Sequence, residues 1–93
     1  MPFWVYMLRC ADDSYYVGHT DDIERRCGQH TAGIFPGYTH SRRPVTLVFS
    51  AELPTRLAAL EAERRIKGWS RAKKAALIDR DWDAISALAR KKF

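Results

Sequence analysis

Two side chains suited to binding an anion stand four residues apart, at Arg26 and His30. Residues at this spacing share one face of a helix, so both can reach the same target. A guanidinium presents a planar fork to phosphate oxygens, and the imidazole can share that target. The pair therefore indicates a phosphate site. The alternative is an ordinary solvated helix face, because charged pairs at this spacing are common.

A carboxylate occupies an unusual place in the Ala/Leu-rich helix expected after Pro54. Leu57, Leu60 and Ile66 mark an apolar stripe, and Glu63 falls on the line through Leu60 and Ile66. A carboxylate on or beside a buried stripe is costly unless it is paired or holds a cation. Two interpretations stay open for this position, a salt bridge to an arginine and a cation site.

Two tyrosines, Tyr6 and Tyr16, lie on the two strands of an expected hairpin. If the turn pairs Cys10 with Ser14, both tyrosines project from the same face of the sheet. A two-residue turn would place them on opposite faces. No Asn-Gly or Asp-Gly sequence decides between these turns. The tyrosines could equally be strand aromatics that pack over a core.

The elements that must position these side chains alternate between strands and helices. Turn-forming and capping residues predict strands over residues 4–10, 15–20 and 45–51, and helices over about 21–31, 55–67, 71–78 and 81–91. The first helix is expected to begin with Thr20 or Asp21 as its cap and to stop near Gly33. Residues 33–44 are expected to form a loop. This order, β-β-α-β-α-α-α, predicts one α/β (α+β) domain with helices packed on a small antiparallel or mixed sheet.

Length and composition restrict the classes to which the protein can belong. The 93 residues allow one domain over 1–93, and the 46% hydrophobic content is enough for it to fold. The sequence contains no stretch of about 18 apolar residues. Its apolar start lacks a basic region and a cleavage site, so neither a membrane span nor a signal peptide is expected. Cys10 and Cys27 form no disulfide framework or zinc motif, so a cytoplasmic location is expected.

The net charge of +5 is distributed unevenly along the chain. Residues 1–55 carry five Lys and Arg against six Asp and Glu, and residues 56–93 carry eleven against five. A basic balance favours anionic partners such as nucleic acid. The excess positive charge that could hold such a partner therefore follows residue 55.

Read in order, these residues resemble the GIY-YIG nuclease superfamily, and in particular its small stand-alone subgroup of endonuclease-like proteins. The likeness is carried by Trp4–Tyr6 and Tyr16–Gly18 as the two motifs, by Arg26 and His30, and by residues 37–44 and 62–74. It covers residues 4 to about 78, and the joint order and spacing of the motifs make it specific. Two departures stand out: Trp4 replaces the first motif glycine, and no asparagine of the kind some members use follows Glu63.

The resemblance implies a three-stranded antiparallel sheet flanked by helices, and metal-assisted hydrolysis of phosphodiester bonds in DNA. The residues that match the family's catalytic positions are Tyr6, Tyr16, Arg26, His30 and Glu63. Glu63 matches the metal-binding glutamate, and Mg²⁺ suits one carboxylate with several waters, with Mn²⁺ as an alternative. Arg26 would neutralise charge in the transition state. Both Tyr6 and His30 stay open as the base that deprotonates water. The resemblance to the family favours the tyrosine. A free tyrosine has a pKa of about 10, which is high for a base near neutral pH and therefore favours the histidine.

DNA is the expected partner, and RNA is the alternative. No membrane association is expected, and the sequence predicts no oligomeric state. Further residues expected to contact nucleic acid are Gly18, Tyr38, His40, Arg42, Arg43, Arg64, Lys67, Arg71, Lys73 and Lys74. Two other classes of function stay open. One is a catalytically silent DNA- or RNA-binding module on the same scaffold. The other is a protein-interaction domain that uses the Ile34-Phe35 loop and the terminal helix.

Overall fold

A three-stranded antiparallel sheet with the strand order β2-β1-β3 forms the centre of the protein. The computed structural model describes residues 2–34 and 37–90. Its elements are β1 (Phe3–Arg9), β2 (Tyr15–Thr20), α1 (Ile23–Ala32), the 3₁₀ helix η1 (His40–Arg42), β3 (Thr46–Leu53), α2 (Arg56–Lys67), α3 (Arg71–Ile78) and α4 (Trp82–Arg90). The fold class and the order of strands and α-helices are those that the sequence predicted. Within the described residues, no helix has the length and apolar character needed to cross a bilayer.

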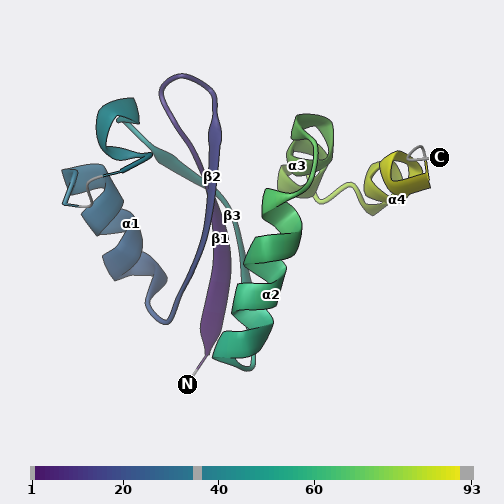
Figure 1. The fold of residues 1–93 in the computed structure, drawn as a ribbon, viewed down its shortest axis with the longest axis horizontal. Coiled ribbons are helices and arrows are strands. Elements are labelled where there is room, and N and C mark those ends of the chain that lie inside the picture. The colour runs from purple at the N-terminus through teal and green to yellow at the C-terminus, as the bar shows by residue number, and fades with distance from the viewer. Residues whose placement is uncertain (1, 35–36, 91–93) are drawn as a thin grey trace.

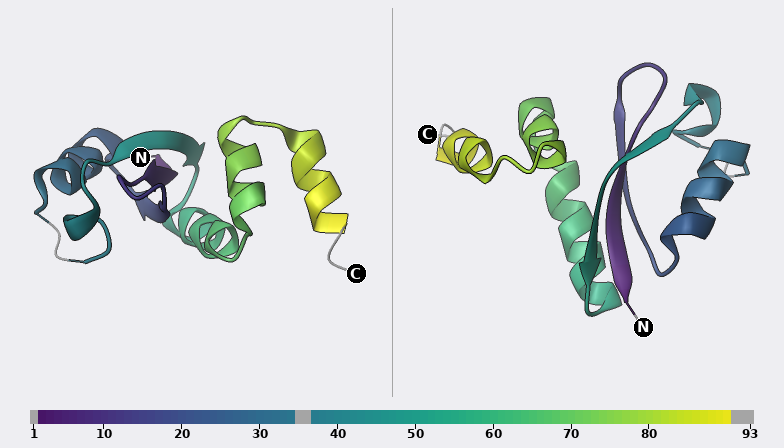
Figure 2. Two further views of the ribbon diagram at one scale, coloured as in Figure 1. Left: turned by 90° about the horizontal axis from the view of Figure 1, so that it is seen from above. Right: turned by 180° about the vertical axis from the view of Figure 1, so that it is seen from behind.

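The sheet separates two sides of the molecule (Figure 1). Helix α1 lies along one side and α2 along the other, where α3 follows it against the sheet, while α4 lies farther from the sheet. Seen from above and from behind, the same arrangement holds (Figure 2). Side chains that meet near the sheet therefore come from α1 on one side or from α2 on the other.

The turn between β1 and β2 decides which face each tyrosine occupies. The Cys10 amide donates to the Ser14 carbonyl over 2.8 Å, and the Asp13 amide donates to the Cys10 carbonyl over 2.9 Å. Asp13 has a φ of 66°, as expected of the left-handed residue that closes a three-residue hairpin loop. In this register Tyr6 faces Gly18 across the strands. Tyr6 and Tyr16 therefore project from the same face, which is the first of the two arrangements considered above.

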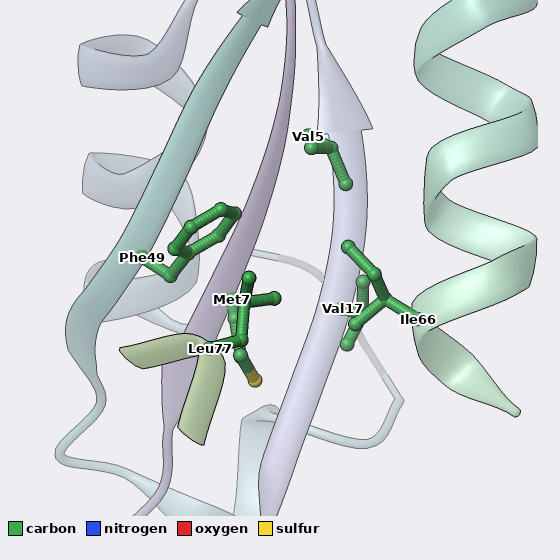
Figure 3. Packing of buried hydrophobic residues seen from close by; sticks show 6 residues of the cluster. All are labelled: Val5, Met7, Val17, Phe49, Ile66 and Leu77. Atoms are coloured by element: carbon green, nitrogen blue, oxygen red, sulfur yellow. The ribbon is translucent and has the colours of Figure 1, made fainter. Parts of the chain in front are cut away.

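The hydrophobic core fills the side of the sheet that α2 and α3 cover (Figure 3). Its buried members are Val5, Met7, Val17, Phe49, Ile66 and Leu77. Because side chains alternate along a strand, the odd-numbered residues of β1 and β2 face α2, and the even-numbered ones face α1. Each fully buried aliphatic side chain contributes about 1.5–3 kcal/mol through removal of apolar surface from water. The core thus fixes the sheet, and the other face carries Tyr6 and Tyr16 beside the buried Leu8.

The first helix is capped one residue later than predicted. Asp22, and neither Thr20 nor Asp21, is the capping residue, because its carboxylate accepts a hydrogen bond from the Arg25 amide over 3.1 Å. The Thr20 hydroxyl instead accepts from the Asp22 amide and so holds the residue before the helix. Gly33 ends the helix as predicted, with a left-handed φ of 72°.

Three further expectations needed correction. Leu57 is 63% exposed and does not belong to the buried stripe of α2, which presents Ala59 and Ile66 to the sheet instead. The third strand spans Thr46–Leu53, so it continues past the predicted end at residue 51. The predicted loop over residues 33–44 also contains the short helix η1. The packing of α2 and the pairing of β3 with β1 set these boundaries, and both depend on residues distant in the sequence.

Candidate active site

A buried hydrogen bond joins Tyr6 of β1 to His30 of α1. The Tyr6 hydroxyl lies 3.1 Å from His30 Nε2, and the two residues are 1% and 3% exposed. His30 reaches the sheet because it lies in the last turn of α1, on the helix face that is turned inward. On its other ring nitrogen, Nδ1 lies 2.8 Å from the hydroxyl of Thr39. The imidazole therefore bridges two hydroxyl groups from different segments of the chain.

Aromatic rings surround this hydrogen bond. The Tyr16 ring lies 5.1 Å from the His30 ring and 6.4 Å from the Tyr6 ring, measured between centroids. Tyr38 stacks on Tyr16 at 6.2 Å, and the guanidinium of Arg42 lies 3.9 Å from the centre of the Tyr38 ring. Three of the five predicted catalytic side chains are thus in one cluster on the face that α1 covers.

Electrostatic interactions join the other two predicted residues to the same hydroxyl. Burial raises the pKa of Tyr6 well above its ordinary value, and Tyr16 and Glu63 raise it further, while Arg26 lowers it. Burial and the Arg26 guanidinium together lower the pKa of His30. Both members of the Tyr6–His30 pair are therefore neutral near pH 7. Arg26 from α1 and Glu63 from α2 therefore shift the pKa of Tyr6 in opposite directions, although their helices lie on opposite sides of the sheet.

Glu63 is held by two hydrogen-bond donors on the side of the sheet that α2 covers. His19 Nδ1 donates to one carboxylate oxygen over 2.8 Å, and the Lys67 ammonium donates to the other over 2.9 Å. Burial alone would raise the pKa of Glu63, but these two hydrogen bonds outweigh it and hold the pKa below its ordinary value. The side chain is 13% exposed and ionised at neutral pH. A salt bridge was one interpretation of this position, and the partner is a lysine and a histidine rather than an arginine.

The chemistry of this carboxylate fits a hard divalent cation. A carboxylate has about four lone-pair sites, so each oxygen of Glu63 retains one beside the hydrogen bond that it accepts. Lys67 is 52% exposed, and its flexible stem lets the ammonium swing into solvent. Mg²⁺ commonly uses one or two carboxylates and completes its shell with water and phosphate oxygens. Within the described residues, no group of three or more His, Cys, Asp and Glu side chains could hold a metal ion.

A separate cavity of about 370 Å³ lies at the start of α1 and contains none of the five predicted residues. Its lining is Trp4, Asp21, Asp22, Ile23, Glu24 and Ser50. The three carboxylates in this lining would repel a phosphate backbone. Because of this charge, we place the candidate site at the Tyr6–His30 cluster and not at the cavity.

Comparison with known proteins places this geometry in a family. A family model described as the GIY-YIG catalytic domain matches residues 2–76. The chain belongs to the GIY-YIG family. Domains of this family are generally nucleases, so membership indicates a hydrolase that acts on nucleic acid. Helix α4 follows the matched region.

Its relatives are small GIY-YIG proteins named UPF0213. The relative from Natronomonas pharaonis is 44% identical over 75 residues, which cover 81% of this chain and 88% of that protein. A UPF0213 protein of Listeria monocytogenes is 46% identical over 77 residues, covering 82% and 86% of the two chains. The solution structure of a UPF0213 protein from Bacillus halodurans is 38% identical, covers 85% of this chain and 84% of that one, and has a TM-score of 0.55. These relatives confirm the resemblance to the stand-alone subgroup.

In this GIY-YIG domain, the loop residues expected to contact nucleic acid also hold the loop together. The Arg42 guanidinium donates to the Asp12 carboxylate over 3.1 Å and to the Tyr38 carbonyl over 2.8 Å. His40 Nδ1 donates to the carbonyl of Gly33 over 3.0 Å. Arg43 in turn donates to the His40 carbonyl over 3.0 Å. These side chains therefore fix the segment that carries Tyr38, whatever else they bind.

The basic residues of the later GIY-YIG helices lie mainly on the surface. Arg64 and Arg71 are exposed, and the Arg71 guanidinium lies 4.6 Å from the centre of the Tyr15 ring. Lys73 and Lys74 are half-buried, and the Lys73 ammonium lies 4.3 Å from the Trp69 ring. These contacts with aromatic rings hold the long side chains in place while leaving their charge available.

Sequence reasoning missed the roles of two residues beside the GIY-YIG motifs. His19 follows the second motif, and the parity of β2 turns it toward α2, where only a polar partner can satisfy its ring. Knowledge of which face of β2 carries His19 would have predicted a contact between His19 and Glu63 of α2. Thr39 gave no signal, because its contact with His30 depends on how the loop folds back over α1.

Proposed function

We propose that this protein is a metal-dependent endonuclease that hydrolyses phosphodiester bonds in DNA. The observation that carries the proposal is the buried hydrogen bond between Tyr6 and a neutral His30. Arg26 lies one helical turn before His30 on α1, and the ionised Glu63 lies on α2. Phosphodiester hydrolysis needs this combination, because a water must lose a proton while negative charge gathers on the phosphate.

The proton of the attacking water passes through Tyr6 to His30. The raised pKa of Tyr6 disfavours a preformed tyrosinate, so Tyr6 can accept a proton only as it gives its own away. The O–H bond of water breaks as a new O–H bond forms on Tyr6, and the original tyrosine proton moves to His30 Nε2. The water oxygen bonds to phosphorus and the bond to the leaving oxygen breaks. This relay gives both candidates for the base a part: Tyr6 contacts the water and His30 stores the proton.

Charge on the phosphate is balanced by the side chains around this pair. Arg26 offers a guanidinium to the phosphate oxygens, and it lies on α1 four residues before His30, on the same face of the helix. Tyr16 packs against the His30 ring and holds it in place. Glu63 would hold a Mg²⁺ or Mn²⁺ ion, which when bound polarises the phosphate and stabilises the leaving oxygen.

The decisive variant is Glu63→Gln, which keeps the shape of the side chain and removes its charge. Cleavage would be measured with labelled single-stranded, duplex, flapped and branched DNA and a matching RNA set, in Mg²⁺, in Mn²⁺ and in EDTA. Glu63→Gln is expected to lower cleavage by at least 100-fold, on the order of what loss of one electrostatic contributor costs, while leaving DNA binding intact.

The matched control is Glu61→Gln, which removes the same charge from an exposed position two residues away on α2. This control should cleave at the native rate. Undiminished cleavage by Glu63→Gln, or full activity of the native protein in EDTA, would contradict the assignment of the metal.

A catalytically silent module that binds nucleic acid is the second candidate. One observation favours it: the Lys67 ammonium already neutralises the Glu63 carboxylate, and a cation would have to compete with it. This candidate predicts that DNA binds with the same affinity in Mg²⁺ and in EDTA and that no substrate of the panel is cut. The cleavage panel therefore separates the two functions directly.

A further inference from the structure

A threonine hydroxyl is buried beneath an otherwise exposed turn. Thr39 is 3% exposed, whereas the next two residues, His40 and Ser41, are exposed. Thr39 precedes the helix η1, where threonine side chains ordinarily cap the first turn, yet its side chain makes no capping hydrogen bond. The hydroxyl points inward instead and lies 2.8 Å from His30 Nδ1.

The place of Thr39 is fixed by contacts that do not involve His30. The Arg42 amide donates to the Thr39 carbonyl over 3.1 Å, and the Arg42 guanidinium donates to Asp12 and to the Tyr38 carbonyl. Arg42 therefore links this turn to the β1–β2 hairpin and holds the backbone on both sides of Thr39. The turn thus holds the Thr39 hydroxyl next to the imidazole through contacts that do not depend on His30.

The two hydroxyls on His30 are chemically different. A phenol is the more acidic group and a better donor, while the oxygen of an aliphatic hydroxyl is the better acceptor because its lone pairs are not shared with a ring. A neutral imidazole has one N–H and one lone pair. The favoured arrangement therefore has Nδ1–H donating to Thr39 and Nε2 accepting from Tyr6.

We propose that Thr39 is a positioning residue that keeps the His30 proton on Nδ1, so that Nε2 can accept the proton of Tyr6. The effect on catalysis rests on the function proposed above, but the effect on the imidazole does not. When Nε2 takes the tyrosine proton, His30 becomes an imidazolium whose Nδ1–H still donates to Thr39. Without that acceptor the proton moves to Nε2, which then donates to Tyr6 and can no longer receive its proton.

The direct test is the tautomer of His30, read from two-bond ¹H–¹⁵N correlation spectra of the ¹⁵N-labelled full chain near pH 7.5. A His30→Gln spectrum assigns the signals. The native protein should show a protonated Nδ1 and an unprotonated Nε2. Thr39→Val keeps the shape but removes the hydroxyl, and it should move the proton to Nε2. Thr39→Ser, which restores a hydroxyl, should return the native pattern.

Cleavage of the labelled DNA panel provides the second measurement. Thr39→Val is expected to lower kcat by about 10- to 100-fold, by analogy with the loss of a partner that orients a metal-bound imidazole, with KM unchanged. Thr39→Ser should keep most of kcat. Ser41→Ala removes a hydroxyl from the exposed part of the same turn and should behave as the native protein.

The outcomes separate the two proposals. A protonated Nε2 in the native protein, or an unchanged tautomer in Thr39→Val, overturns the role of Thr39 even if the enzyme cleaves DNA. The predicted tautomers with no cleavage of any substrate support the role of Thr39 and contradict the nuclease. If Thr39→Val does not fold, the native and Thr39→Ser spectra still decide, because both must show the proton on Nδ1.

Discussion

Close contact between a glycine and a phenol determines where the Tyr6 hydroxyl lies. A Cβ atom added to Gly18 would lie 2.6 Å from the Tyr6 hydroxyl oxygen and 2.7 Å from the ring carbon that bears it. Neither distance is possible for a real side chain, so any other residue at 18 would push the phenol away from His30. The sequence predicted Gly18 as a contact for nucleic acid, which stays a prediction, and in the structure its missing side chain makes room for Tyr6.

The stability of the protein should fall as His30 becomes protonated. Burial and Arg26 lower the pKa of His30 in the folded protein, whereas the unfolded chain titrates near the ordinary value of about 6.5. The unfolded state therefore binds more protons in this range, and the free energy of unfolding rises with pH. The contribution of neutral His30 to the free energy of unfolding is complete above about pH 6.5. It is lost as the pH falls through the lower pKa that His30 has in the folded protein.

Urea unfolding at pH 7.5 and pH 5.5 measures this effect. The native protein should lose more unfolding free energy between the two pH values than His30→Gln does, because glutamine does not titrate. An equal loss in both proteins would show that His30 is not desolvated as the structure describes.

At the scale of elements, α1 is the part that presents Arg26 and His30. Its bounds are set by the Asp22 cap and by Gly33, whose left-handed φ of 72° a residue with a Cβ adopts only at a cost. Gly28 within this helix and Gly33 after it differ in whether the structure has room for a side chain. A Cβ at Gly28 would meet nothing within 4 Å, whereas a Cβ at Gly33 would lie 2.5 Å from the Arg43 guanidinium.

These two glycines give a matched pair of substitutions with effects of opposite sign. Gly33→Ala should lower the free energy of unfolding by about 1 kcal/mol through the left-handed φ. Gly28→Ala should raise it by about 0.5–1 kcal/mol, because alanine restricts the unfolded chain and suits a helix interior. Urea unfolding of both variants checks the pair, and a stabilising Gly33→Ala would contradict the left-handed end of α1.

How far the sequence predicts this architecture depends on whether the signal is local. Helix ends marked by glycine and capping side chains are local, so the stops at Gly33 and Gly68 were predictable. The face on which Tyr6 and Tyr16 meet depended on a turn whose residues allow two registers, and only the pairing of whole strands decides it. Glu63 was predicted beside the buried stripe from periodicity alone. Leu57 was misplaced because it is two and a half turns, or about 180°, away from Ile66 around α2.

At the scale of the whole molecule, acidic and basic side chains gather at different places on the surface. The acidic residues Asp21, Asp22 and Glu24 gather at the start of α1, while the basic residues collect on α2 and α3. Because α1 and α2 lie on opposite sides of the sheet, these charges are separated in space as well as in sequence (Figure 1). A DNA backbone that reaches the Tyr6 hydroxyl would be attracted from the side of α2 and α3 and repelled from the start of α1.

DNA binding should therefore depend steeply on salt, and the dependence should map to α2 and α3. The logarithm of the binding constant is expected to fall linearly with the logarithm of the salt concentration, with a slope of about −0.9 for each neutralised phosphate on duplex DNA. Replacing the exposed Arg64 and Arg71 by glutamine removes two such contacts, so the slope of the double variant should shrink by about 2. Fluorescence anisotropy of a labelled duplex in EDTA, over a series of salt concentrations, measures both slopes.

The control for this experiment is Arg25→Gln, because Arg25 is exposed on α1 and paired with Asp21 over 3.4 Å among the acidic residues. Its loss lowers the net charge by one, as each of the other substitutions does, but at the acidic start of α1 and not on α2 or α3. An unchanged slope in Arg25→Gln with a reduced slope in the double variant would assign the phosphate contacts to α2 and α3 rather than to net charge. Equal changes per charge in all variants would mean that binding follows net charge alone, and a flat salt response in the native protein would favour a protein partner over DNA.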